Sequence, residues 1–179
     1  MHNTSELFNR VVSPVDATDV LLSHGFRPYS GLVWKKEHAT IEKIIEVSDM
    51  DDVHAGITRL DSLVPGYVKS YELIFDDQYI KIQMTEYTGK TPKQLKTKSE
   101  IVNLIISCIE FIKRAQPYEV VDFNSSNIFI GDSVHFIDLD DVFYGRINLH
   151  SPYTYYKRMK WAHKQVSFSE FEELWKEHF

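Results

Sequence analysis

Two carboxylates and one amide gather around a predicted hairpin in the second half of the chain. Asp122 is followed five residues later by Asn127, and Asp138 follows the second of two short apolar runs, 128–130 and 134–137. The Gly-Asp-Ser turn between the runs favours an antiparallel pair of strands. Closing this hairpin would bring Asn127 and Asp138 close together in space.

This set of groups suits phosphoryl transfer from a nucleotide. The Mg²⁺ that accompanies a nucleoside triphosphate prefers oxygen ligands, and the side chains of Asn127 and Asp138 would supply two of them. Asp122 would orient the attacking hydroxyl and accept its proton. The alternative interpretation is an ordinary surface hairpin with scattered Asp and Asn.

The pattern Asp-x₄-Asn, followed by a hairpin and Ile-Asp, resembles the catalytic segment of the protein-kinase-like superfamily. The resemblance implies that Asp122 is the catalytic aspartate and that Asn127 and Asp138 bind the metal and its nucleotide. Val-Val precedes Asp122 where the family has His-Arg, and Leu-Asp follows Asp138 where it has Phe-Gly. The form Ile-Asp-Leu-Asp is closer to aminoglycoside kinases and to minimal bacterial effector kinases.

A lysine in the third predicted strand, 40–47, is the candidate phosphate ligand. Side chains alternate between faces along a strand, so Lys43 shares its face with three aliphatic residues. A lysine there is costly unless it meets an anion. Lys43 therefore resembles the kinase lysine that holds the nucleotide phosphates. Alternatives are that Lys43 is a strand-edge lysine reaching solvent, or that Lys35 or Lys36 takes the role.

Two parts of the kinase pattern are weak in the first half of the chain. We expect a first strand ending near Gly25-Phe26, a turn over 28–31 and a second strand over 32–37. This region contains only two glycines, where the family has a glycine-rich loop. The helix predicted over 49–63 lacks the Glu that pairs with the strand lysine. The acidic candidates in its place are Asp52 and Asp61.

The segment after a second predicted hairpin, 68–75 with 79–87, resembles the kinase hinge. An acidic-aromatic pair is followed there two residues later by glycine. The resemblance implies that the carbonyl of Glu86 and the amide of Thr88 bond the adenine ring. A generic linker between a hairpin and a helix is the alternative.

The remaining elements are predicted to be helical. Apolar residues recur at helical spacing over 98–115, with Ser99 as the N-cap, and Ser167 opens a capping box for a final helix. The aromatic and basic stretch 153–161 is expected to pack on the larger lobe. It would otherwise bind an acidic partner or a nucleic acid.

Composition restricts the classes of function. The chain has 179 residues, 43% of them hydrophobic and 13% aromatic, which is enough for a core. Its formal net charge of −6 disfavours general nucleic-acid binding. The single Cys108 lies in an apolar helical run and is expected to be a buried thiol. With no membrane span and no signal peptide expected, a cytoplasmic protein is predicted, or one secreted into a host cell by a signal-independent route.

The sequence as a whole predicts an α+β protein with a compact two-lobe, kinase-like fold. A small antiparallel-sheet lobe over about 1–87 would be followed by a reduced, mainly helical lobe over 88–179. The resemblance covers roughly 23–141 and is greatest to minimal kinases of bacterial effectors and phages. It implies transfer of the γ-phosphate of ATP, with Mg²⁺, to Ser, Thr or Tyr of a protein. A protein substrate or an activating protein would be the partner. The alternatives are a pseudokinase that binds a regulatory partner, favoured by the departures above, and a small-molecule phosphotransferase.

Overall fold

The computed structural model describes most of the chain and divides it into two compact units, Met1–Glu86 and Tyr87–Phe179. The described residues are 22, 26–30, 33–36, 41–46, 50–74, 79–120 and 123–179, with the first three strands described by their backbone. The two glycines of the expected phosphate-binding loop, Gly25 and Gly31, lie outside these residues.

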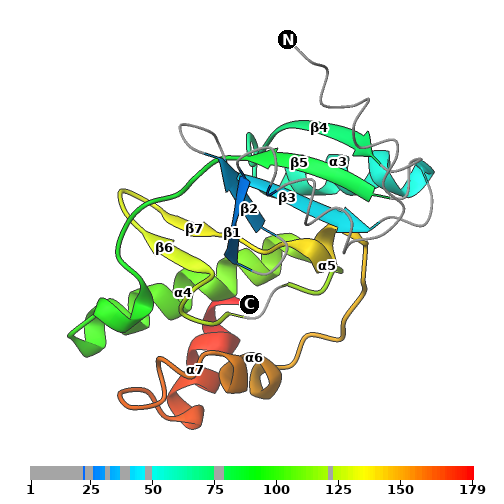
Figure 1. The fold of residues 1–179 in the computed structure, drawn as a ribbon. Helices are drawn as coiled ribbons and strands as arrows, with labels where there is room; N and C mark the ends of the chain where they lie inside the picture. The colour runs from blue at the N-terminus through cyan, green and yellow to red at the C-terminus, as the bar shows by residue number, and fades with distance from the viewer. Residues whose placement is uncertain are drawn as a thin grey trace. The chain divides into compact units, whose positions relative to one another are not determined.

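The first unit is built on one antiparallel sheet with the strand order β1-β2-β3-β5-β4 (Figure 1). A single described helix, α3, follows β3 in the chain and lies along β4. The sheet and the helix agree with the expectation for this half of the chain. The elements are β1 (Phe26–Ser30), β2 (Val33–Lys36), β3 (Ile41–Glu46), α3 (Met50–Leu63), β4 (Val68–Ile74) and β5 (Tyr79–Met84).

The first strand lies further along the chain than its sequence predicts. A turn was expected over 28–31, but Pro28 and Ser30 lie within β1 and pair with Trp34 and Val33 of β2. Proline is accepted at the edge of a sheet because its missing N–H is not needed by a further strand, and β1 is an edge strand. The register also shifts between Pro28 and Ser30, which marks a bulge.

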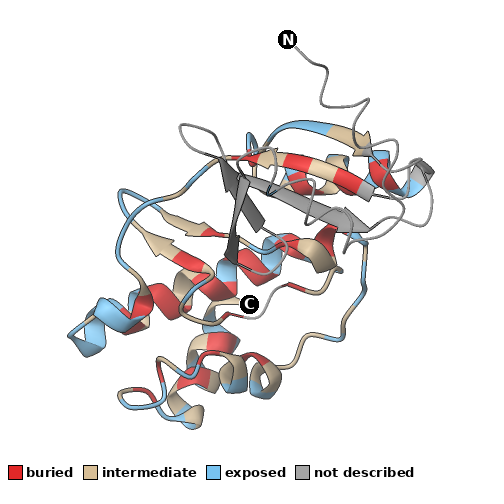
Figure 2. Cartoon of the chain, in the orientation of Figure 1, coloured by how far each residue is buried: buried red, intermediate tan, exposed pale blue. Residues whose placement is uncertain are grey.

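The core of the first unit lies between α3 and the alternate residues of β5 (Figure 2). Residues of a strand point to opposite faces in turn, and Lys81 on the other face of β5 forms an ion pair with Glu72 of β4, with 2.9 Å between Nζ and Oε2. β5 ends at Met84, three residues before the expected end. The buried hydrophobic residues described in this unit are Val53, Leu60, Tyr67, Ile80, Ile82 and Met84.

The second unit is mainly helical, with one short hairpin. The long helix α4 packs against the final helix α7, and α6 packs against α7 as well. The fold class predicted from the sequence, α+β with an antiparallel sheet followed by a mainly helical part, is therefore confirmed. The elements are η1 (Pro92–Gln94), α4 (Lys98–Ala115), β6 (Ile128–Ile130), β7 (Val134–Phe136), α5 (Asp140–Phe143), α6 (Pro152–Arg158) and α7 (Phe168–His178).

The N-cap of α4 is Thr97, two residues before the expected Ser99. The hydroxyl of Thr97 accepts a hydrogen bond from the Glu100 N–H, and the Glu100 carboxylate accepts one from the Thr97 N–H at 2.9 Å. A capping box needs Glu or Gln three residues after the cap, and Ser99 has Val102 there. The reciprocal hydrogen bonds between Thr97 and Glu100 therefore place the N-cap of α4 at Thr97.

Aromatic rings from five segments form the core of the second unit. Phe111 of α4 stacks on Phe136 of β7, with 4.3 Å between the ring centroids. Phe123 contacts the edge of Phe136 and also Tyr155 of α6, which stacks on Trp175 of α7. All five side chains are buried. Cys108 of α4 is buried too, as predicted, and burial raises the pKa of its thiol.

Among the described residues, no helix is long and apolar enough to cross a membrane. The longest, α4, has exposed charged residues such as Glu110 and Lys113 on its outer face.

The start of α7 carries the predicted capping box and an ion pair to α4. Ser167 Oγ accepts from the Glu170 N–H, and Glu170 accepts from the Ser167 N–H at 2.8 Å and from Lys98 Nζ. The Lys98 bond, followed by those from Ser167, lowers the pKa of Glu170 to about 2 from the ordinary 4.5. The ionised carboxylate therefore stabilises the folded state above about pH 4.5, and this contribution is lost as the pH falls towards 2.

We expect Glu170→Gln to lower the urea midpoint of unfolding at pH 7, because glutamine retains the shape of the cap but not the charge. The difference from the unsubstituted protein should shrink as the pH is lowered from 4.5 to 2. Glu173→Gln is the matched control, since Glu173 is exposed on the same helix without an ion pair among the described residues. An equal effect of the two substitutions at every pH would contradict the assignment.

Candidate functional site

The β6–β7 hairpin brings Asn127 and Asp138 together, as its sequence predicts. Ile128 pairs with Phe136 and Ile130 with Val134, so the two strands are closed in register. The Ile137 N–H then donates to the Asn127 carbonyl at 3.0 Å. The amide nitrogen Nδ2 of Asn127 lies 3.5 Å from Oδ2 of Asp138. The polar groups before and after the hairpin therefore meet at its open end.

Asp138 occupies a backbone conformation that few side chains adopt. Its φ is 65°, and among the described residues it is the non-glycine residue with positive φ. Aspartate is one of the residue types that tolerate this left-handed region. The conformation turns the chain from β7 into α5 and lets the next residue, Leu139, be buried. Strained positions of this kind concentrate at functional sites, because a required side-chain position then outweighs the local strain.

The carboxylate of Asp138 is exposed, although the residues around it are buried. Phe136 and Leu139 on either side of it are 6% and 1% exposed. The hairpin end is therefore anchored in the core while Asp138 stays exposed to solvent. Asn127 is half-buried beside it.

A short turn before the hairpin positions Asn127. The side-chain oxygen of Asn124 accepts a hydrogen bond from the Ser126 N–H at 2.8 Å and one from the Ser126 hydroxyl. The Asn127 N–H donates to the Asn124 carbonyl at 3.2 Å. Sequence analysis passed over Asn124, although an Asn followed two residues later by Ser is a known signal for a turn closed by its own side chain.

The predicted catalytic residue Asp122 lies outside the described residues, and its role stays a prediction. The residues on either side of it are held firmly. Val120 and Phe123 are 0% and 1% exposed, and Phe123 is packed between Phe136 and Tyr155.

Hydrogen bonds from the segment 158–161 hold the backbone on both sides of this loop. Arg158 Nη1 donates to the Val120 carbonyl at 3.2 Å, and Trp161 Nε1 donates to the Phe123 carbonyl at 2.8 Å. Arg158 also forms an ion pair with Glu119, with 2.8 Å between Nη2 and Oε1. The aromatic and basic stretch was expected to pack on the rest of the lobe. The stretch does pack there, and its Arg158 and Trp161 also bond the carbonyls of Val120 and Phe123. Residue spacing alone does not indicate these two bonds.

The segment expected to act as a hinge is anchored on the same hairpin. Lys90 and Ile130 exchange two backbone hydrogen bonds, at 2.9 and 2.8 Å. Tyr87 stacks on His135, with 4.2 Å between the ring centroids, so His135 has a packing role. Gly89, with φ 152°, lies so close to β6 that a Cβ atom would be 2.6 Å from the Ile130 carbonyl oxygen. The glycine is therefore required by this close approach.

The predicted nucleotide contacts beyond the hairpin are described in part. Lys43 lies in β3 opposite Ile82 of β5, and its side chain is outside the described part of the structure. Glu86 and Thr88 are both exposed, Glu86 at the end of the first unit and Thr88 near the start of the second. The roles of these three residues stay predictions.

The two acidic residues considered as partners of the strand lysine are both exposed on α3. Asp61 accepts a hydrogen bond from the Gly66 N–H at 3.2 Å, which ties the end of α3 to the following turn. Asp61 therefore has a structural role, whereas no hydrogen bond or ion pair joins Asp52 to another residue in the part of the chain that the structure describes.

The donor set at the hairpin end fits a hard cation. A carboxylate and an amide oxygen are ligands that Mg²⁺ accepts, and water and phosphate oxygens complete its shell. Within the described residues, no group of three or more His, Cys, Asp or Glu side chains gathers to hold a metal. Asn127 and Asp138 would therefore bind Mg²⁺ only together with other oxygen ligands, such as those of a nucleotide.

Comparison with solved structures shows a likeness in fold, whereas comparison of sequences finds no match. No family model and no curated protein sequence matches the chain. The fold is similar to that of the kinase PK-1 of the Cydia pomonella granulovirus, with a TM-score of 0.41 and 16% identical residues. The match covers 77% of this chain and 61% of the viral kinase, so this chain spans less than two thirds of that protein's length.

Gly89→Ala should destabilise the second unit by about 1–3 kcal/mol, the usual cost of an unfavourable backbone conformation, because the new methyl group meets the Ile130 carbonyl. The measurement is chemical unfolding followed by tryptophan fluorescence. Gly131→Ala is the control, since its Cβ would meet only the Thr88 carbonyl oxygen at an ordinary 3.8 Å. Equal stability of the two variants would show that the close approach of Gly89 is not present in solution.

Trp161→Phe removes the N–H donor and keeps an aromatic ring, and it should cost about 1 kcal/mol, the net contribution of one hydrogen bond. Amide hydrogen exchange should become faster in a peptide spanning 118–127 and stay unchanged in α4. Lys164→Gln, on the same turn without a hydrogen bond to this loop, is the control. Unchanged exchange in the Trp161 variant would mean that this bond does not hold the loop.

Proposed function

We propose that this protein transfers the γ-phosphate of ATP to a hydroxyl group of a Ser, Thr or Tyr residue in another protein. The observation that carries the proposal is the meeting of Asn127 and Asp138 at the open end of the hairpin, with Asp138 held in a left-handed conformation. Two oxygen ligands are thereby fixed five and sixteen residues after Asp122.

The chemistry proposed for these residues is positioning and charge stabilisation. Asp122 orients the acceptor hydroxyl towards the phosphorus atom and accepts its proton as the bond to phosphorus forms. Asn127 and Asp138 hold the nucleotide through Mg²⁺, which reduces the repulsion between the phosphate charges and the incoming oxygen. The phosphoryl group passes directly to the acceptor, and ADP leaves with the electron pair of the broken bond.

The fixed flanks of the loop support a catalytic use of Asp122. A general base must stay within hydrogen-bond reach of the proton it abstracts. Buried Val120 and Phe123, with their carbonyls bonded to Arg158 and Trp161, restrict where the intervening residues can go. Positioning of this kind accounts for much of the rate enhancement in reactions without a covalent intermediate.

The other nucleotide contacts in the proposal come from the sequence resemblance. Lys43 would bond the phosphates, and the backbone of Glu86 and Thr88 would bond the adenine. Strand β3, which carries Lys43, is a central strand of the five-stranded sheet. A central strand is a rigid support for such a side chain.

Asp138→Ala should abolish the dependence of ATP binding on Mg²⁺ and reduce transfer of labelled phosphate by about 100-fold or more. Titration calorimetry with and without Mg²⁺ gives the first quantity, and labelling of a lysate as acceptor pool gives the second. Asp132→Ala is the matched control, because Asp132 is exposed in the turn of the same hairpin. Transfer that persists in the Asp138 variant would refute the assignment. Binding that depends on Mg²⁺ without any transfer would identify a pseudokinase.

Asp122→Ala should leave ATP affinity within about twofold and slow transfer by about 10²–10⁴-fold, the usual contribution of a general base. A single-turnover measurement with saturating ATP separates the two quantities. Loss of ATP binding, or loss of the folded state in circular dichroism, would assign Asp122 a structural role instead.

A further inference from the structure

A long basic stretch of the second unit includes cations that the proposed catalytic arrangement does not use. Residues 142–169 contain no Asp or Glu, yet they carry five Lys or Arg residues, in a protein whose formal net charge is −6. Such a separation of charge gives one part of the surface a potential opposite to that of the whole. The five cations are Arg146, Lys157, Arg158, Lys160 and Lys164.

Three of these five cations are already engaged within the protein. Arg146 forms an ion pair with Asp141, and Arg158 forms one with Glu119. The ammonium of Lys157 lies over the ring of Tyr153, 5.3 Å from its centroid. Lys160 and Lys164 are exposed, and neither forms an ion pair with any described residue.

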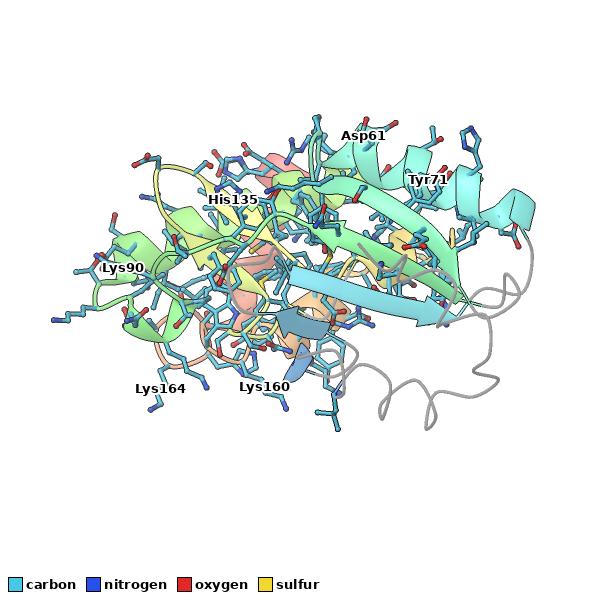
Figure 3. The ribbon with its side chains drawn as sticks, turned by 45° about the horizontal axis from the view of Figure 1, so that its top comes forward. Asp61, Tyr71, Lys90, His135, Lys160 and Lys164 are labelled. Carbon is cyan, nitrogen blue, oxygen red and sulfur yellow. The ribbon has the colours of Figure 1, made fainter. Side chains whose placement is uncertain are left out.

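One of these two lysines is next in the chain to a residue that contacts Phe123, which follows Asp122 in the sequence. Lys160 immediately precedes Trp161, whose indole nitrogen is bonded to the Phe123 carbonyl. Figure 3 shows Lys160 and Lys164 pointing outward along the same edge of the ribbon. An acidic segment bound at Lys160 would therefore lie against the same segment, 158–161, that bonds the backbone of Val120 and Phe123.

Lys96 adds a third charge to this edge. Gln165 Nε2 donates to the Lys96 carbonyl at 3.5 Å, so the turn that carries Lys164 lies against the segment before α4. Lys96 is exposed, and the nearby Glu100 carboxylate binds its backbone N–H. Hydrogen bonds from Thr97 and from the Lys96 N–H lower the pKa of Glu100 most. The charge of Lys90 lowers this pKa to a smaller extent. We call Lys96, Lys160 and Lys164 the basic edge.

We propose that the basic edge binds an acidic segment of the protein acceptor and so selects substrates with Asp or Glu near the phosphorylated hydroxyl. This inference rests on the proposed kinase function for the transfer step, whereas the binding step can be measured without it. Complementary charge sets partner choice and the rate of encounter, although each exposed pair is weak.

The chemistry of the edge favours an acidic peptide over a nucleic acid. Binding of single-stranded nucleic acid relies on free aromatic faces for base stacking. Two tyrosine rings of the same segment already have ring partners: Tyr156 stacks on His163 with 4.3 Å between centroids, and Tyr153 lies edge-on to Phe168. The Tyr156 hydroxyl also donates to the Val166 carbonyl at 3.0 Å.

The test compares two fluorescein-labelled peptides with one Ser and one Tyr each, flanked by Glu in one peptide and by Gln in the other. Fluorescence anisotropy at low salt should give a Kd at least about fivefold lower for the Glu peptide, and this preference should weaken at high salt. The double variant Lys160→Glu and Lys164→Glu should lose the preference. Lys69→Glu, an exposed lysine of the first unit, is the charge-changing control and should keep it.

The same peptides serve as acceptors of labelled phosphate, which separates this inference from the kinase function. In the unsubstituted protein, KM should be lower for the Glu peptide than for the Gln peptide. In the double variant this difference in KM should be lost while kcat is kept. These two results together would support the kinase function and the basic edge. Equal Kd values for the two peptides would overturn the basic edge even if both are phosphorylated. Tighter binding of a single-stranded oligonucleotide than of the Glu peptide would overturn it as well. A Glu preference in binding with no transfer to any acceptor would refute the kinase function and leave the basic edge standing.

Discussion

The burial of Phe123 is the interaction on which the second unit depends. Its ring lies between Phe136, at the end of the hairpin, and Tyr155 of α6, and it is 1% exposed. Phe123 is the residue after Asp122, whereas Phe136 is two residues before Asp138. One packing contact therefore links the loop that carries the candidate base to the strand that delivers the candidate metal ligand. Close packing makes such a link stiff, because side chains in a core have few alternative positions.

Hydrogen bonds to the backbone fix the orientation that this packing leaves open. A buried ring fixes where a segment lies, but it does not fix the direction of the backbone at the next residue. The bonds from Arg158 and Trp161 to the carbonyls of Val120 and Phe123 supply that direction. Their donors come from a segment some 38 residues further along the chain. The helix α6 and the turn after it thus serve the candidate site without carrying any of its proposed catalytic groups.

The composition of this short segment suits both its observed contacts and the proposed acidic partner. The side chains of Tyr155, Arg158 and Trp161 turn towards the loop, while Lys160 and Lys164 are exposed. Placing acidic residues there would compete with Glu119 for Arg158 and would neutralise the outer face. A stretch free of Asp and Glu therefore suits both the internal support of the loop and an acidic partner outside.

Local patterns in the sequence determined most elements of this protein. The hairpin at 128–137, the helix before it and the capping box at Ser167 follow from spacing and turn chemistry, which act between residues only a few positions apart. The meeting of Asn127 and Asp138 also followed, since a closed hairpin leaves no other arrangement. Tertiary structure decided what depends on distant partners. Pro28 lies in β1 because that strand is at the sheet edge. Arg158 and Trp161 bond the carbonyls of Val120 and Phe123 because α6 packs beside Phe123. The left-handed turn at Asp138 lets Leu139 reach the core. Spacing carries no information about such contacts, because they form between segments whose approach is set by the whole fold.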